Sequence, residues 1–213
     1  MDIDYLWKKG KKEDWEKALT KYCTNDKDEY MNDISKNPNI IRNMNGEEFY
    51  KFLYDHYFVW KYTQKNRLAR NKSLLEKSYQ SSEGFDCLER IKNNFFKIHD
   101  IMPMNTRLNV FMITEISGLG IAGASGLLSI LYPEEYGTLD FFLVQELKKV
   151  STIKNLEDIK KINGSSLRIK DAVFLEDIIR NKAEKLNDLF GTQMWNPRKI
   201  DMVLWANHCK QKS

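Results

Sequence analysis

Residues that build metal centres and disulfide frameworks are scarce in this sequence. Its three cysteines, Cys23, Cys87 and Cys209, are isolated and odd in number, and its three histidines are equally scattered. Zinc sites and disulfide scaffolds need paired ligands at short, regular spacings. We therefore expect no metal ion bound by side chains and no disulfide framework.

Long apolar runs are absent as well. No stretch approaches the roughly 20 consecutive apolar residues that a membrane-spanning helix requires. The first residues show no signal-peptide pattern. These absences favour a cytoplasmic protein without a membrane partner.

Few residues interrupt helices, since the chain of 213 residues contains four prolines and ten glycines. Alternating patterns typical of strands are scarce, and apolar residues recur instead at helical spacing. Hydrophobic residues make up 42% of the chain, which is enough to bury a core. We expect an all-α fold, and the net charge of +4 permits a polyanionic partner.

Several helices are predicted from their caps and stops. Asn45 or the following glycine caps a helix whose apolar stripe extends to Trp60. Asp140 is placed to cap another helix. A long amphipathic helix is expected over residues 170–190, and Gly191 is expected to end it.

The most informative stretch runs from residue 108 to residue 147 and is centred on Gly118 and Gly120. Helical patterns lie on both sides, and the turn between them can adopt positive φ at either glycine. A helix that begins at Gly120 exposes backbone N–H groups, which can hold a phosphate without a basic side chain. Small residues follow, among them Gly123 and Gly126, and they let a neighbouring helix approach closely.

This stretch resembles the hairpin of the helix-hairpin-helix DNA glycosylase superfamily. The family pattern is an apolar residue, a small residue or proline, and then Gly-apolar-Gly, which residues 116–120 match with Ser117 where proline is usual. A helix rich in small residues follows, and Leu139-Asp140 matches the apolar-Asp step that opens the next helix. Asp140 lies 20 positions after Gly120, as in the family. The resemblance covers about a fifth of the chain.

The resemblance implies a two-lobed helical bundle in which the N-terminal and C-terminal helices share one lobe. We expect a single helical protein over residues 1–213. One lobe would comprise residues 1–80 and 165–213, and the other, with the helix-hairpin-helix motif, residues 84–164. By resemblance, the catalytic aspartate of the family is Asp140 in this chain.

The resemblance also implies how DNA would be held. The N–H groups of Gly118, Gly120 and Ala122 would contact the phosphate backbone, and carbonyls near Gly118 and Gly120 would offer a site for K+ or Na+. Ala122 stands where bifunctional members carry their Schiff-base lysine, which implies a monofunctional enzyme without an organic cofactor. No iron–sulfur cluster is expected, because only Cys209 is C-terminal.

A carboxylate beside the sugar fits the chemistry of base release. Cleavage of an N-glycosidic bond develops positive charge on the sugar, which Asp140 would stabilise while it orients or deprotonates a water. A base in duplex DNA must first be flipped out of the stack. The alternative is that Asp140 only caps a helix, a role for which aspartate is favoured.

A run from His56 to Leu75 contains no acidic residue and interleaves basic with aromatic side chains. Lys65, Arg67 and Arg70 in this run are candidates for contacts with the DNA backbone. The alternative is a solvated helical face whose aromatic residues turn inward.

An aromatic pocket for the flipped base is expected from the proposed chemistry. Its candidates, chosen by residue type alone, are Trp60, Tyr62, Phe142 and Trp195. Trp195 fits a core position equally well, and Glu115 near the glycines is either a second acid or an exposed helical residue.

These features favour a DNA glycosylase-like enzyme that hydrolyses the bond between a damaged or modified base and its sugar. One alternative is a DNA-binding module that keeps the hairpin without catalysis. Another is a helical protein–protein adaptor in which the hairpin is a plain helix–helix corner. No pattern predicts an oligomeric state.

Overall fold

The computed structural model describes residues 2–22 and 26–209, so Cys23 lies outside the described residues. Every regular element in the described residues is a helix, and no strand occurs among them, which confirms the all-α prediction. The elements are α1 (Ile3–Lys9), α2 (Lys12–Leu19), α3 (Asp26–Lys36), α4 (Asn39–Arg42), α5 (Gly46–Lys51), the π-helix η1 (Phe52–Tyr57), α6 (Phe58–Lys61), α7 (Lys65–Tyr79), α8 (Ser82–Ile101), α9 (Thr106–Thr114), α10 (Ile121–Leu131), α11 (Phe141–Leu147), α12 (Leu156–Lys161), α13 (Ile169–Phe190) and α14 (Pro197–Cys209). None of these helices is long and apolar enough to cross a bilayer.

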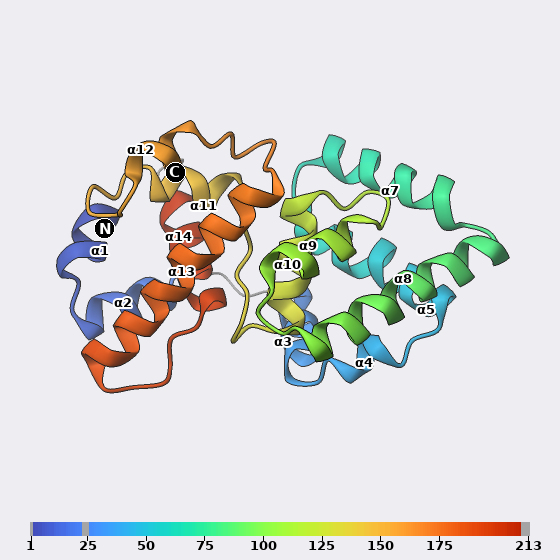
Figure 1. The fold of residues 1–213 in the computed structure, drawn as a ribbon, viewed down its shortest axis with the longest axis horizontal. Coiled ribbons are helices and arrows are strands. Elements are labelled where there is room, and N and C mark those ends of the chain that lie inside the picture. The colour runs from blue at the N-terminus through green and yellow to red at the C-terminus, as the bar shows by residue number, and fades with distance from the viewer. Residues whose placement is uncertain (1, 23–25, 210–213) are drawn as a thin grey trace.

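Figure 1 shows the helices in two groups, with α1, α2 and α11–α14 on one side and α3–α10 on the other. The buried apolar residues follow the same division. The first cluster draws on residues 31–136, and the second on residues 3–18 and 139–204. The N-terminal helices α1 and α2 therefore pack with the C-terminal helices.

These clusters divide the chain at other places than the expected lobes, 1–80 with 165–213 and 84–164. Residues 80–84, which the expected lobes place at a boundary, are not a long loop, because α8 begins at Ser82. Instead, α7 and α8 pack against each other, and Leu75, Tyr79 and Leu88 are buried in the same cluster. The change of cluster falls between Tyr136 and Leu139, just before Asp140.

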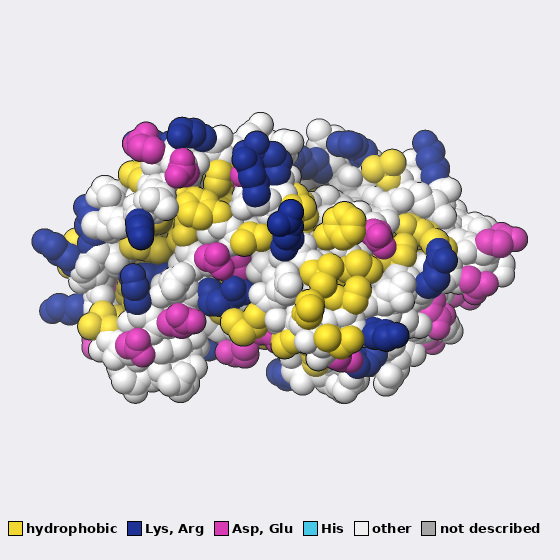
Figure 2. Space-filling model, viewed as in Figure 1, with side chains coloured by type: hydrophobic (Ala, Val, Ile, Leu, Met, Phe, Trp, Pro, Cys, Tyr) yellow, Lys and Arg dark blue, Asp and Glu magenta, His cyan; other side chains and the backbone are white. Residues whose placement is uncertain are grey.

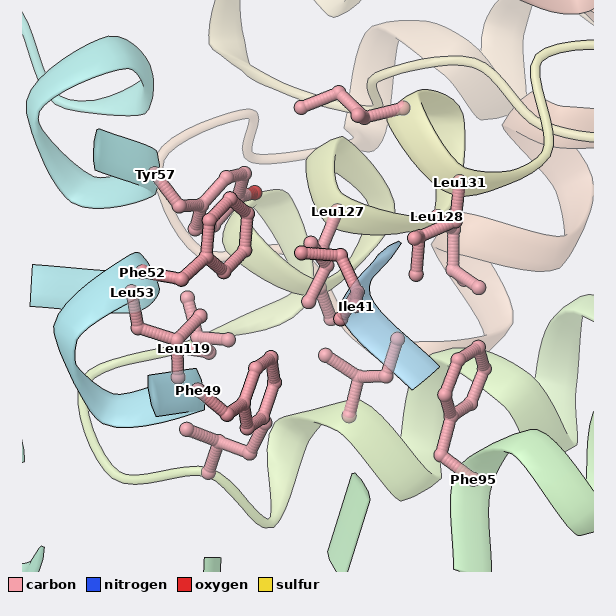
Figure 3. Packing of buried hydrophobic residues seen from close by; sticks show 14 of the residues in the cluster. Ile41, Phe49, Phe52, Leu53, Tyr57, Phe95, Leu119, Leu127, Leu128 and Leu131 are labelled. Atoms are coloured by element: carbon pink, nitrogen blue, oxygen red, sulfur yellow. The ribbon is translucent and has the colours of Figure 1, made fainter. Parts of the chain in front are cut away.

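Figure 3 shows the first cluster from close by, where side chains of α5 and η1 face those of α10. The labelled residues on the two sides are Phe49, Phe52, Leu53 and Tyr57 from α5 and η1, and Leu127, Leu128 and Leu131 from α10. Leu119, from the turn before α10, joins them and is 4% exposed. Its burial anchors the turn to the core.

Local caps fix several helix ends as the sequence predicts. Asn45 caps α5 by accepting a hydrogen bond from Glu48 N. Gly191 ends α13 in the left-handed conformation, with a φ of +60°. The stripe that ends near Trp60 is not one regular helix, because the π-helix η1 interrupts it. π-Helical turns are rare and occur often at functional sites.

Figure 2 shows hydrophobic side chains gathered right of centre, over α9 and the end of α8. The large hydrophobic residues exposed in these elements and the turn between them are Ile101, Met102, Met104 and Phe111. None of the residues predicted for DNA contact or catalysis belongs to this set.

Candidate active site

The turn between α9 and α10 holds its two glycines in different backbone conformations. Gly118 has a φ of +91°, and a Cβ atom there would lie 2.7 Å from the carbonyl oxygen of Asn71. Gly120 has an extended conformation with φ −82° and ψ −176°, and the space beside it is open. The fold of this turn therefore requires glycine at residue 118 alone.

Gly120 is the N-cap of α10 and has no side chain that could bond to the first turn. The N–H groups at a helix start lack partners within the helix. This end of α10 borders a groove of about 510 Å3, which runs between α7 and the loop at residues 164–167. The groove thus combines helix N–H groups with the cationic side chains of α7.

Most of the residues predicted to contact the DNA backbone line this groove. They are Gly118, Gly120, Ala122, Arg67 and Arg70. Lys65, at the start of α7, is exposed and is not among the lining residues. Glu115 lines the groove but not the cavity beside Asp140.

The carbonyl oxygens of both glycines already accept hydrogen bonds within the protein. Gly118 O accepts one from the Tyr62 hydroxyl at 3.1 Å, and Gly120 O accepts one from Ala124 N at 2.8 Å. Burial raises the pKa of Tyr62 to about 12, so this phenol stays protonated at neutral pH and remains a donor. Each carbonyl oxygen keeps a second lone pair, so the K+ or Na+ site at these two oxygens stays a prediction.

The small residues of α10 make room for residues 57–62. A Cβ atom on Gly123 would lie 2.6 Å from the hydroxyl of Tyr62. One on Gly126 would lie 2.7 Å from the hydroxyl of Tyr57 and 3.1 Å from Cδ of Lys61. Side-chain atoms, not the backbone of a neighbouring helix, occupy the space at Gly123 and Gly126, and this space lets the Lys61 side chain pass along α10 towards Asp140.

Asp140 caps α11 and also bonds to a lysine. Its Oδ1 accepts hydrogen bonds from Phe142 N at 2.9 Å and Leu143 N at 3.2 Å, which confirms the predicted cap. Its Oδ2 accepts one from Lys61 Nζ at 3.2 Å. The two side chains are 18% and 8% exposed, so the ion pair is shielded from bulk water.

The segment before Asp140 is held by buried side chains from three helices. The N–H groups of residues 137–139 donate in order to Glu176 at 3.0 Å, Asp201 at 3.2 Å and Ser125 at 2.9 Å. These side chains belong to α13, α14 and α10. An extended segment has no internal hydrogen bonds, so these side chains replace them and fix the direction in which Asp140 leaves the core.

Two of these side chains are buried carboxyls in different surroundings. Asp201 forms an ion pair with Arg198 at 2.7 Å, and Arg198 also donates to the Thr138 hydroxyl. Glu176 has no salt-bridge partner among the described residues, and burial raises its pKa to about 8. At neutral pH Glu176 is therefore mostly protonated.

A cavity of about 300 Å3 borders Asp140. Tyr62, Arg67 and Ala122 line both this cavity and the groove at the hairpin, so the two hollows lie side by side. Phe142, a predicted residue, and Phe141, which was not predicted, also line this cavity. The structure thus brings Asp140 together with two of the four aromatic residues predicted for a base pocket.

The other two aromatic candidates do not line the cavity. Trp195 is 2% exposed and packs edge-on against Trp15, with ring centroids 5.5 Å apart. Trp60 packs against the first cluster, and the guanidinium of Arg198 lies 5.3 Å from its ring. Trp195 therefore occupies a core position, which the sequence analysis gave as the alternative to a base pocket.

Lys61 was not among the residues predicted for the site. It lies 79 positions before Asp140, too far apart for a spacing rule to connect them. The one indication in the sequence was the pair Gly123 and Gly126, which showed that some segment would approach α10 but not which one.

A comparison of this chain with known protein families, curated proteins and solved structures finds no match.

Proposed function

We propose that this protein is a monofunctional DNA glycosylase-like hydrolase of the helix-hairpin-helix kind, built from two lobes around a cleft. The observation that carries the proposal is the position of Asp140. Its carboxylate borders a cavity of about 300 Å3 that lies beside the groove at the hairpin glycines and shares lining residues with it. A base flipped from a duplex held in the groove would enter this cavity.

The proposed reaction is hydrolysis of the bond between the base and C1′ of the sugar. The cap uses Oδ1 of Asp140. Oδ2, which also accepts the hydrogen bond from Lys61 Nζ, would stabilise positive charge on the sugar and accept a proton from water. Ala122 supplies no amine from the hairpin, and the proposal assigns water as the nucleophile, since Lys61 Nζ is held as an ammonium partner of Asp140. The reaction requires no organic cofactor.

DNA would be held by its phosphates and the base by aromatic faces. The N–H groups at the start of α10 and the side chains of Arg67 and Arg70 line the groove where phosphates would lie. Tyr62 and Phe142 in the cavity wall would stack on the flipped base.

The test is release of bases from duplexes that carry a panel of damaged or modified nucleotides, followed by alkali cleavage of the resulting abasic sites. The key variant is Asp140→Asn, because asparagine is an equally good N-cap and preserves α11. We expect it to lower the rate of base release by about 100-fold or more, while duplex affinity stays within about twofold. Equal rates for the variant and the unmodified protein would contradict the proposal.

A second candidate is a DNA-binding module without catalysis. The observation in its favour is that the groove with Gly120, Arg67 and Arg70 extends well beyond the cavity of Asp140. Such a module would bind duplexes with a steep dependence on salt and release no base from any of them. A protein–protein adaptor would bind no DNA even at low salt.

A further inference from the structure

The amine of Lys61 occupies an unusual place for a lysine. Its stem lies against α10, where a Cβ atom on Gly126 would lie 3.3 Å from Cε of Lys61, and the side chain is only 8% exposed. Nζ donates to Asp140 Oδ2 at 3.2 Å. An ammonium group has three donors, and Nζ has no second acceptor among the described residues, so two donors remain for a ligand in the cavity.

The cavity beside Asp140 carries more positive than negative charge. Among the described residues that line it, Lys61 and Arg67 are cations and Asp140 is the sole carboxylate. The remaining lining is neutral, with hydrogen-bonding groups from Thr63 and Gln64. A ligand that is cationic would meet two like charges in a partly desolvated space, whereas developing negative charge would be stabilised there.

We propose, on the basis of the function proposed above, that Lys61 is a second catalytic residue, which protonates the departing base. The site would then act on neutral bases, which without that proton would have to leave as anions, and it would discriminate against bases that are already cationic through alkylation.

The proposed step balances in protons and electrons. The bond between C1′ and the base nitrogen breaks, and its electron pair stays on the base, which takes a proton from the Lys61 ammonium. Water attacks C1′ and gives a proton to Asp140. The direct hydrogen bond between Asp140 Oδ2 and Lys61 Nζ then returns that proton to the amine, so the site ends in its starting state.

A cationic base needs no such help. N7-methylguanine departs as a neutral molecule, so its release requires no proton from Lys61. The charge of Lys61 would only repel it. The dependence of rate on the leaving group therefore separates an acid at this position from a lysine that merely supports the fold.

The experiment measures base release from three kinds of duplex: those with uracil or 8-oxoguanine, those with 5-fluorouracil, and those with N7-methylguanine. The variant is Lys61→Met, which keeps most of the aliphatic stem that packs on Gly126. The matched control is Lys77→Met, an exposed lysine of α7 that lines neither hollow. Duplex affinity and melting temperature are measured for every protein.

Relative to spontaneous release, the unmodified protein should accelerate release of the neutral bases more than release of N7-methylguanine. Lys61→Met should slow release of uracil or 8-oxoguanine by about 100-fold. The loss should shrink for 5-fluorouracil, a better leaving group, and vanish for N7-methylguanine. Lys77→Met should behave as the unmodified protein.

Two results overturn this inference while the proposed hydrolysis stands. One is that the unmodified protein accelerates release of N7-methylguanine over its spontaneous rate more than release of the neutral bases. The other is that Lys61→Met lowers the rate of base release by the same factor on every duplex. Failure to release a base from any duplex overturns the proposed function and this inference together.

Discussion

The two parts of the candidate site depend on backbone and side chains to different degrees. The hairpin turn depends first on the backbone of Gly118, which acts through its conformation and the lack of a side chain, and the hydroxyls of Tyr62 and Tyr79 also bond to the turn. The segment that carries Asp140 is fixed by side chains from three other helices. A short motif can encode the first kind of structure, whereas the second depends on residues far away along the chain.

The largest loss of stability is expected from substitution of Asp201, which is buried and holds the segment before Asp140. Asp201→Ala would leave Arg198 buried without its partner and the Thr138 N–H without an acceptor. Removing one partner of a buried ion pair costs about 3–5 kcal/mol. Urea denaturation should show this loss, and a loss below about 1 kcal/mol would mean that Asp201 does not hold the segment.

The hairpin offers a matched pair of glycine substitutions. Gly118→Ala would place a methyl group 2.7 Å from Asn71 O at a φ of +91°, and it should lower the free energy of unfolding by about 2–3 kcal/mol. Gly120→Ala meets open space in an extended conformation, and its effect should stay within about 0.5 kcal/mol. Thermal melts of both variants test the contrast, and equal shifts would contradict it.

Glu176, which binds the segment before Asp140, should make the stability of the protein depend on pH. Its pKa in the folded protein is about 8, above the ordinary value of 4.5, because the carboxyl is buried. Between pH 4.5 and about 8 the unfolded chain releases the proton and the folded protein keeps it. The contribution of Glu176 to the free energy of unfolding is therefore full below pH 4.5 and is lost as pH rises through about 8.

Glu176→Gln should remove this part of the pH dependence, because glutamine does not titrate and still accepts the bond from Gly137 N. The measurement is the free energy of unfolding of both proteins at pH 5 and pH 8.5. The free energy of unfolding of the variant, relative to that of the unmodified protein, should be larger at pH 8.5 than at pH 5. An unchanged difference would show that Glu176 titrates as an ordinary carboxyl.

Local chemistry made much of the fold predictable. Asp140 caps α11 and Gly191 ends α13 because a cap or a left-handed residue depends on its immediate neighbours. The boundaries of the two clusters were not predictable in this way, since the polar residues 80–84 do not prevent α7 and α8 from packing together. The π-helix η1 has no periodicity of its own in the sequence.

The residues of the candidate site also differ in how far the sequence could predict them. Gly118, Gly120 and Asp140 stand in one continuous motif and could be named from it. Lys61 reaches Asp140 from 79 positions away, and Asp201 binds Thr138 N across 63 positions. Contacts of this length follow from packing, which sequence spacing alone does not specify.

The most direct test of the account is a single-turnover measurement of abasic-site formation with the unmodified protein and Asp140→Asn, both at concentrations that saturate the same modified duplex. Saturation removes binding from the comparison and leaves the chemical step. The account predicts abasic sites with the unmodified protein and a rate about 100-fold lower, or none, with the variant. Equal rates, or binding without any abasic sites, would contradict it.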